Sequence, residues 1–156
     1  MKLLTIKNIG PIDHVELNMK RINVIMGPQS AGKSCILKIA CFCAWAEKRI
    51  LLEQGKNGFS DYAYLKENLI AFHKLDGFIR EGSMFSYKTD HVAFTIDFGK
   101  KENEIFSMVF NKKGHWDYKR SRVAYIPAER NVVAVIPNWF EVSLGNTDLK
   151  TFVSDW

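Results

Sequence analysis

The sequence predicts an α/β fold in which a glycine-rich loop joins a strand to a helix. The loop, Gly27 to Ser34, reads GPQSAGKS. It follows a short apolar run, Ile22 to Met26, and opens a long apolar stretch that we expect to be helical from Lys33 to about Leu52. From residue 83 onward, short β-rich segments alternate with turn residues, which is typical of an antiparallel meander.

The loop matches the pattern GxxxxGK[ST] in full. In such a loop the backbone N–H groups point inward, and the N-terminus of the following helix adds its positive dipole end. Gly27 and Gly32 would keep the curl open, because a Cβ would clash with bound phosphates or forbid the backbone angles. Lys33 would reach the terminal phosphates, and the Ser34 hydroxyl would bind Mg²⁺. An ordinary strand-to-helix turn is the alternative, and both flanks disfavour it.

We therefore expect a site for a nucleoside triphosphate with Mg²⁺, and Ser34 as the metal ligand. The residues expected to bind the nucleotide here are Gly27, Pro28, Gln29, Ser30, Ala31, Gly32, Lys33, Ser34 and Cys35.

Composition favours one cytoplasmic domain. A chain of 156 residues can bury one core, and 47% hydrophobic with 13% aromatic residues exclude wholesale disorder. The longest apolar run, Cys35 to Ala46, is interrupted by Lys38 and is too short to span a bilayer, and we see no export signal. Cys35, Cys41 and Cys43 fall on different faces of one expected helix, which excludes a disulfide or zinc framework. We interpret them as buried hydrophobes, with redox sensitivity of Cys35 as the alternative.

The net charge of +5 is concentrated in the region from Lys100 to Arg122. A basic face of this kind can bind nucleic acid phosphates. Alternatively, the lysines flank strands and protect a sheet edge from pairing with other chains. We favour the second interpretation, because no recognition helix or pattern of stacking aromatics accompanies the charge.

The expected elements follow a simple order. Lys2 to Asn8 and the alternating segment Ile12 to Met19 predict an antiparallel hairpin, and the short apolar run Ile22 to Met26, which lacks that alternation, predicts a buried central strand. The helix from Lys33, apolar on all sides, should be sandwiched between sheet layers. A second helix should begin near Ser60 and Asp61, which are the candidates for its N-cap. Further strands are expected at 84–88, 92–98, 105–111, 115–119 and 122–126. We thus divide the single domain into a phosphate-loop core (1–54), a helical segment (59–75), a β meander (83–126) and a lobe-joining segment with a tail (127–156).

Three segments together suggest a family: KNIGPI (Lys7 to Ile12), GPQSAGKS, and YIPAERN (Tyr125 to Asn131). They resemble the N-terminal lobe of ABC-type P-loop ATPases of the recombination and SMC kind, close to bacterial AAA-family ATP-binding proteins. The resemblance implies a P-loop NTPase fold, ATP and Mg²⁺ as cofactors, and self-association of two ATPase heads around ATP. It also implies a nucleotide contact from Asn8, and from Lys7 beside it.

The chain departs from this family pattern in its catalytic motifs. The only local match to a Walker B strand ends at Asp97 and is followed by Phe98, where the family has a second acid. Residues 143–146 only faintly echo a signature motif, and the Q-loop glutamine is absent. Glu129 could hold a magnesium-bound water in its place or Arg130 could contact phosphate, and a buried salt bridge that anchors the loop is the alternative. We therefore expect an incomplete domain that binds Mg-ATP and hydrolyses it only when completed by a further lobe and a second head. The catalytic residues stay unassigned, with Glu129 and Asp97 as candidates.

Two other functions stay open at this stage. The chain could be a complete small P-loop phosphotransferase (a kinase) that uses Asp97 or Glu129 as its acid, although its arginines do not cluster in one lid. It could also be a DNA-binding module that uses the basic 100–122 region, which would show steep salt dependence without nucleotide.

Overall fold

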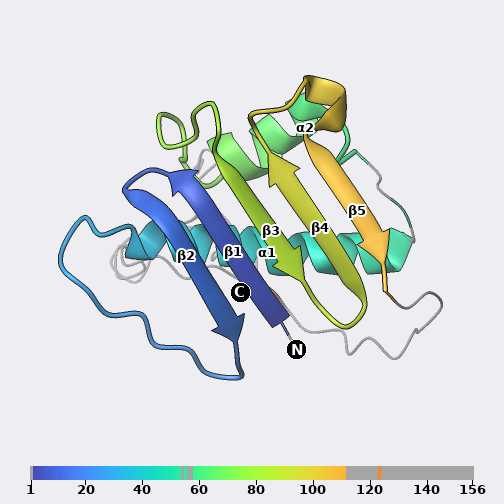
Figure 1. Ribbon diagram of the computed structural model, residues 1–156. Helices are drawn as coiled ribbons and strands as arrows, with labels where there is room; N and C mark the ends of the chain where they lie inside the picture. The colour runs from blue at the N-terminus through green and yellow to red at the C-terminus, as the bar shows by residue number, and fades with distance from the viewer. Residues whose placement is uncertain (1, 54, 56–57, 112–122, 124–156) are drawn as a thin grey trace, which may run out of the picture.

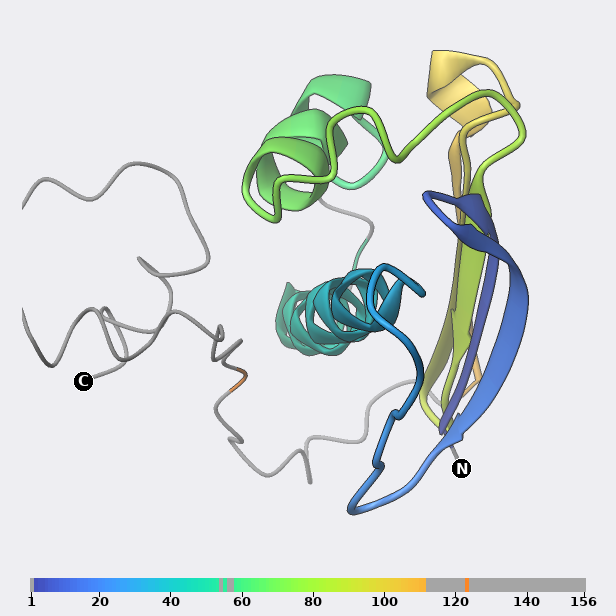
Figure 2. The same cartoon turned by 90° about the vertical axis from the view of Figure 1, so that its left-hand side faces the viewer.

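The computed structural model describes residues 2–53, 55, 58–111 and 123 of the chain. These residues form one antiparallel sheet, and the helices lie on one of its faces (Figure 1; Figure 2). The strands expected at 115–119 and 122–126, and the segment after them, lie outside the described residues.

The sheet has five strands in the order β2-β1-β3-β4-β5, and every neighbouring pair is antiparallel. The strands are β1 (Lys2–Ile9), β2 (Ile12–Met19), β3 (Met84–Lys88), β4 (Val92–Asp97) and β5 (Phe106–Phe110). The hairpin expected from the first two segments is confirmed, and so are the strands expected near 84–88, 92–98 and 105–111.

Alternation along the strands decides which face is buried. Leu4 on β1 lies opposite Tyr87 on β3, and Tyr87 lies opposite Phe94 on β4. All three side chains are at most 2% exposed. Because side chains two residues apart share a face, this register gathers the apolar residues on the side of the sheet that the helices cover.

The helix α1 (Lys33–Glu53) crosses this buried face, as expected from its apolar sequence. Ile39, Phe42, Ala46 and Ile50 recur at helical spacing and are fully or almost fully buried. The Phe42 ring meets Phe85 of β3 edge to face, with 6.2 Å between centroids. The expectation that sheets would cover α1 on both sides is not met by the described residues, because they form a single sheet.

One buried charge ties α1 to the sheet. Glu47 is 1% exposed, and its Oε2 accepts a hydrogen bond from Lys2 Nζ at 2.8 Å and another from Tyr87 Oη at 3.2 Å. The carboxylate therefore joins the helix to β1 and β3 at once.

A second helical segment lies beside α1. It begins with α2 (Tyr62–Leu65) and continues as a π-helical stretch, η1 (Lys66–Ala71). Asp61 caps it as expected, because its carboxylate accepts a hydrogen bond from Ala63 N at 2.9 Å. A single 3₁₀ turn, η2 (Glu102–Glu104), precedes β5. Among the described helices, none has the length and apolar content needed to cross a membrane.

The expected central strand at Ile22 to Met26 is wrong for the described structure. This run pairs with no strand of the sheet, and Ile22, Val24 and Met26 are 79%, 78% and 86% exposed. Figure 2 shows the physical reason: after β2 the chain leaves the sheet and runs to the start of α1, away from any strand edge. Only Ile25 of the run packs partly against the core.

Candidate functional site

The glycine-rich loop leads directly into α1. Gly32 O accepts the first hydrogen bond of the helix, from Ile36 N at 3.0 Å, and inside the loop Ala31 N donates to Pro28 O at 3.4 Å. Ser30 and Gly32 have φ angles of 63° and 85°, in the left-handed region. Left-handed residues placed between right-handed ones turn successive N–H groups toward one side, which is how backbone nests bind anions.

The N–H groups at this end of α1 are available. Within the described part of the chain, those of Gly32, Lys33, Ser34 and Cys35 have no acceptor. The first N–H groups of any helix lack intrahelical partners, and they carry the positive end of the helix dipole. The loop therefore presents a set of converging donors that suits an anion.

Lys33 folds back over the loop that carries it. Its Nζ donates to Gly27 O at 2.8 Å and also to Pro28 O. Both contacts are exposed hydrogen bonds to neutral carbonyls. An anion that binds at the N–H groups would offer this ammonium a stronger, charge-assisted partner at the same place.

Gly32 is required by close packing as well as by its φ angle. A Cβ at this position would lie 2.7 Å from Ile12 Cγ1 and 3.1 Å from Pro11 Cγ. The sequence predicts Gly32 as the residue that leaves room for phosphate, but the nearest obstacle in the structure is the start of β2. The loop is thus pressed against the turn between β1 and β2.

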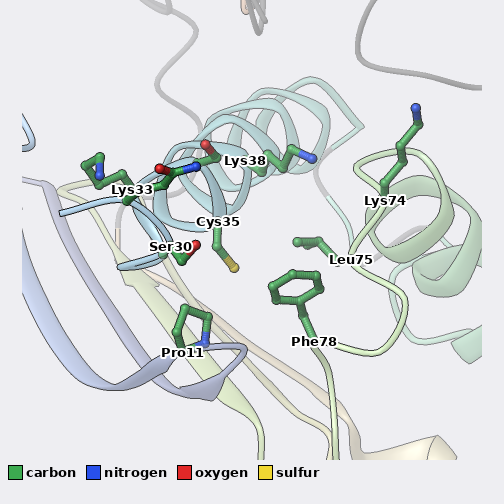
Figure 3. Close-up of a pocket in the computed structure, with 11 residues that line it drawn as sticks. Pro11, Ser30, Lys33, Cys35, Lys38, Lys74, Leu75 and Phe78 are labelled. Atoms are coloured by element: carbon green, nitrogen blue, oxygen red, sulfur yellow. The ribbon is translucent and has the colours of Figure 1, made fainter. Parts of the chain in front are cut away.

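A cavity of about 440 Å³ opens beside the loop (Figure 3). Its lining comes from three parts of the chain: the loop with the start of α1, the β1–β2 turn, and the segment that follows η1. The lining residues are Pro11, Gln29, Ser30, Gly32, Lys33, Ser34, Cys35, Lys38, Lys74, Leu75 and Phe78.

Most of the expected nucleotide-binding residues line this cavity. Gln29, Ser30, Gly32, Lys33, Ser34 and Cys35 do so, whereas Gly27, Pro28 and Ala31 are not among its lining residues. Among the described residues, no cluster of three or more His, Cys, Asp or Glu side chains could hold a metal ion.

The other candidates lie apart from the cavity lining. The Asn8 amide donates to Gly82 O at 3.2 Å, and Asn8 O accepts a hydrogen bond from Ser83 Oγ, so the residue joins β1 to the chain before β3. Asp97 ends β4, and its carboxylate accepts a hydrogen bond from Gly99 N at 3.0 Å. Neither side chain lines the cavity. Glu129 and Arg130 lie outside the described residues.

Cys35 lies at the inner wall of the cavity and is 5% exposed. Burial raises the pKa of its thiol, and the positive charge of Lys38 opposes this shift only in part. Burial also raises the pKa of the Cys43 thiol well above its ordinary value. Both thiols therefore stay protonated near neutral pH, which favours the structural interpretation of the cysteines over redox sensitivity.

Sequence reasoning missed five lining residues: Pro11, Lys38, Lys74, Leu75 and Phe78. One of them carried a signal, because Lys38 is the charge that interrupts the apolar run of α1. Its Nζ donates to His73 O at 2.6 Å, and it thereby ties the helix to the segment after η1. The other four reach the cavity through contacts between distant parts of the chain, which a local pattern does not encode.

Comparison with known proteins agrees with this geometry. The family model described as an AAA domain matches residues 3–134. No curated protein and no solved structure gave a significant match. The matched range includes the glycine-rich loop, the whole described sheet and the segment that follows η1. The chain therefore belongs to the AAA domain family of P-loop ATPases.

Proposed function

We propose that this chain binds ATP together with Mg²⁺ through the loop from Gly27 to Ser34. The observation that carries the proposal is the set of acceptor-free N–H groups from Gly32 to Cys35, which lie at a cavity that Lys33 and Lys38 also line. Backbone donors, a helix N-terminus and ammonium groups are the partners that a triphosphate needs. The membership in an ATPase family supports ATP as the nucleotide.

The loop N–H groups, Lys33 and Ser34 would each contact a different part of the Mg-ATP complex. The loop N–H groups would hold phosphate oxygens, and Lys33 would leave the carbonyls of Gly27 and Pro28 to contact the terminal phosphates. Ser34, the second residue of α1, offers a hydroxyl at the cavity, which suits a Mg²⁺ ligand. When bound, Mg²⁺ would bridge phosphate oxygens and offset their charge.

The described residues account for binding better than for hydrolysis. Activation of a water needs a base within hydrogen-bond reach, and the described lining of the cavity contains no carboxylate. The Asp97 carboxylate is engaged with Gly99 N, outside the lining. We infer that the chain acts as one cytoplasmic ATPase head of the ABC and SMC type, and that self-association completes its site. Glu129 stays a candidate base.

The described residues give the two alternative functions no support. A kinase would need an acid at the cavity, and the described lining has none. For a DNA-binding module, the described part of the basic region contributes Lys100 and Lys101, which lie beside the acidic turn Glu102–Glu104. Binding of DNA without nucleotide, with a steep salt dependence, would favour that module instead.

The test is calorimetric titration of ATP with Mg²⁺ into the wild type, Lys33→Ala and Lys100→Ala. Lys100→Ala removes the same charge from an exposed position outside the cavity lining. A charge-assisted contact is worth about 1.5–3 kcal/mol, so Lys33→Ala should weaken binding about 10- to 100-fold. The control should bind like the wild type. Equal affinity of Lys33→Ala and the wild type would refute the proposal.

Two further measurements test the Mg²⁺ ligand and the absence of hydrolysis. Ser34→Ala should lose most of the gain in affinity that Mg²⁺ gives, while binding in excess EDTA changes little. Phosphate release should stay far below about 1 per second, the low end for complete enzymes. Faster release by the chain alone would mean that the site already contains its base.

A further inference from the structure

The cavity extends past the phosphate loop to a second wall that the proposed phosphate contacts do not use. This wall is formed by Pro11 from the β1–β2 turn and by Leu75 and Phe78 from the segment after η1. Figure 3 shows these three side chains around the same opening as Ser30 and the Cys35 thiol. Leu75 and Pro11 are apolar, and Phe78 is 42% exposed, so its ring is accessible from the cavity.

The structure fixes where the Phe78 ring is placed. Phe78 N donates to Leu75 O at 3.0 Å, and Phe78 O accepts from Gly10 N at 2.8 Å, so the backbone is held on both sides. Gly10 has φ 54°, and a Cβ there would lie 2.2 Å from Phe78 Cδ1. The ring therefore rests on the bare backbone of the turn between β1 and β2. An aromatic side chain anchored in this way is preorganised for binding.

A nucleotide bound at the loop would bring its base toward one side of the cavity. The loop end carries the N–H groups and Lys33, which suit phosphate, whereas the Phe78 end offers an aromatic face beside Pro11 and Leu75. Flat aromatic bases stack on such faces without a need for matching hydrogen bonds. A cavity of about 440 Å³ also lies within the range of small-molecule sites.

We propose that Phe78, flanked by Pro11 and Leu75, is the subsite that stacks on the purine base of the nucleotide whose phosphates bind the loop. The inference rests on the proposed function and deepens it. Phe78 acts in binding and takes no part in phosphate chemistry.

The experiment compares two ligands, ATP and inorganic tripolyphosphate, which lacks a base. Both are titrated with Mg²⁺ into the wild type, Phe78→Leu, Phe78→Tyr and Lys33→Ala. Phe78→Leu keeps an apolar group on Gly10 but removes the aromatic face, and it should weaken ATP binding about 5- to 100-fold while tripolyphosphate binds as before. Phe78→Tyr keeps the ring and should retain ATP affinity. Lys33→Ala should weaken both ligands.

The outcomes separate this inference from the proposed function. If the wild type binds neither ligand, or if Lys33→Ala changes nothing, both are overturned. If Phe78→Leu binds ATP like the wild type, or loses both ligands equally, only the base subsite is overturned. A measurement on the wild type alone adds a test that needs no variant: ATP should bind more tightly than CTP, because two fused rings cover more of Phe78 than one. Equal affinities would overturn the stacking.

Discussion

Gly32→Ala tests how the glycine-rich loop is held against the sheet. The new Cβ would lie 2.7 Å from Ile12 Cγ1, and Ile12 is only 6% exposed and has little room to move. Alanine at φ 85° costs about 1–2 kcal/mol of backbone strain, and a forced contact in a packed core costs about 1–3 kcal/mol more. The free energy of unfolding should fall by about 2–5 kcal/mol in total.

Gly77→Ala is the matched control. Gly77 has φ 77°, close to that of Gly32, but a Cβ there would meet nothing within 4 Å. It should therefore cost only the backbone strain of about 1–2 kcal/mol. The difference between the two variants, about 1–3 kcal/mol, isolates the contact with the β1–β2 turn. Urea unfolding followed by circular dichroism measures both values.

A double mutant locates the clash on Ile12. Ile12→Ala removes the two Ile12 atoms that crowd Gly32 and leaves Pro11 Cγ, at 3.1 Å, so adding Gly32→Ala in that background should cost less than it does in the wild type. If Gly32→Ala and Gly77→Ala destabilise equally in the wild-type background, the close approach of loop and turn is refuted.

Two further predictions concern buried ionisable groups. Lys2→Met removes one of the two hydrogen-bond donors to the buried Glu47 carboxylate and leaves the Tyr87 hydroxyl. Because Lys2 is 46% exposed, the free energy of unfolding in urea should fall by only about 1–3 kcal/mol. The control Lys88→Met, at an exposed end of β3, should change it by no more than about 0.5 kcal/mol, and equal effects of the two variants would contradict a stabilising role of the Lys2–Glu47 pair. The folded protein holds the Cys43 thiol neutral above its ordinary pKa, whereas the unfolded chain ionises from about pH 8.5 upward. The free energy of unfolding should therefore be insensitive to this thiol below that pH and fall above it by up to about 1.4 kcal/mol per pH unit. Cys43→Ala should flatten this alkaline decline, and an unchanged slope would contradict it.

The sequence predicted the elements whose pattern is local. Alternation of apolar and polar residues identified β2, and a long apolar stretch interrupted by Lys38 identified α1, whose observed end at Glu53 lies one residue beyond the expected one. The fixed spacing of the loop likewise placed Lys33 and Ser34 at the start of a helix. In each case the information lies within a few neighbouring residues, where chain geometry alone sets which side chains share a face.

The second wall of the cavity could not be predicted in this way. Phe78 follows a turn, where nothing in the surrounding pattern distinguishes it from a surface residue. Its position depends on the pairing of Gly10 N with Phe78 O, across 68 residues of sequence. Such contacts follow from the packing of whole elements, so a cavity wall made by two distant turns becomes visible only in the folded chain.

The run from Ile22 to Met26 is a second case in which the local sequence pattern did not predict where a segment lies in the fold. Its β-branched, apolar residues favour an extended backbone with buried side chains, but hydrophobicity alone does not specify which element the run packs against. In the described sheet β1 pairs with β2 on one edge and with β3 on the other, so no central position is open for a strand that leads into the glycine-rich loop. Because this run leads directly into Gly27, whatever covers Ile22, Val24 and Met26 would also restrain the first residue of the loop. Covering these side chains should therefore stiffen the proposed phosphate site, and we expect the stability of the run to affect the proposed binding of nucleotide.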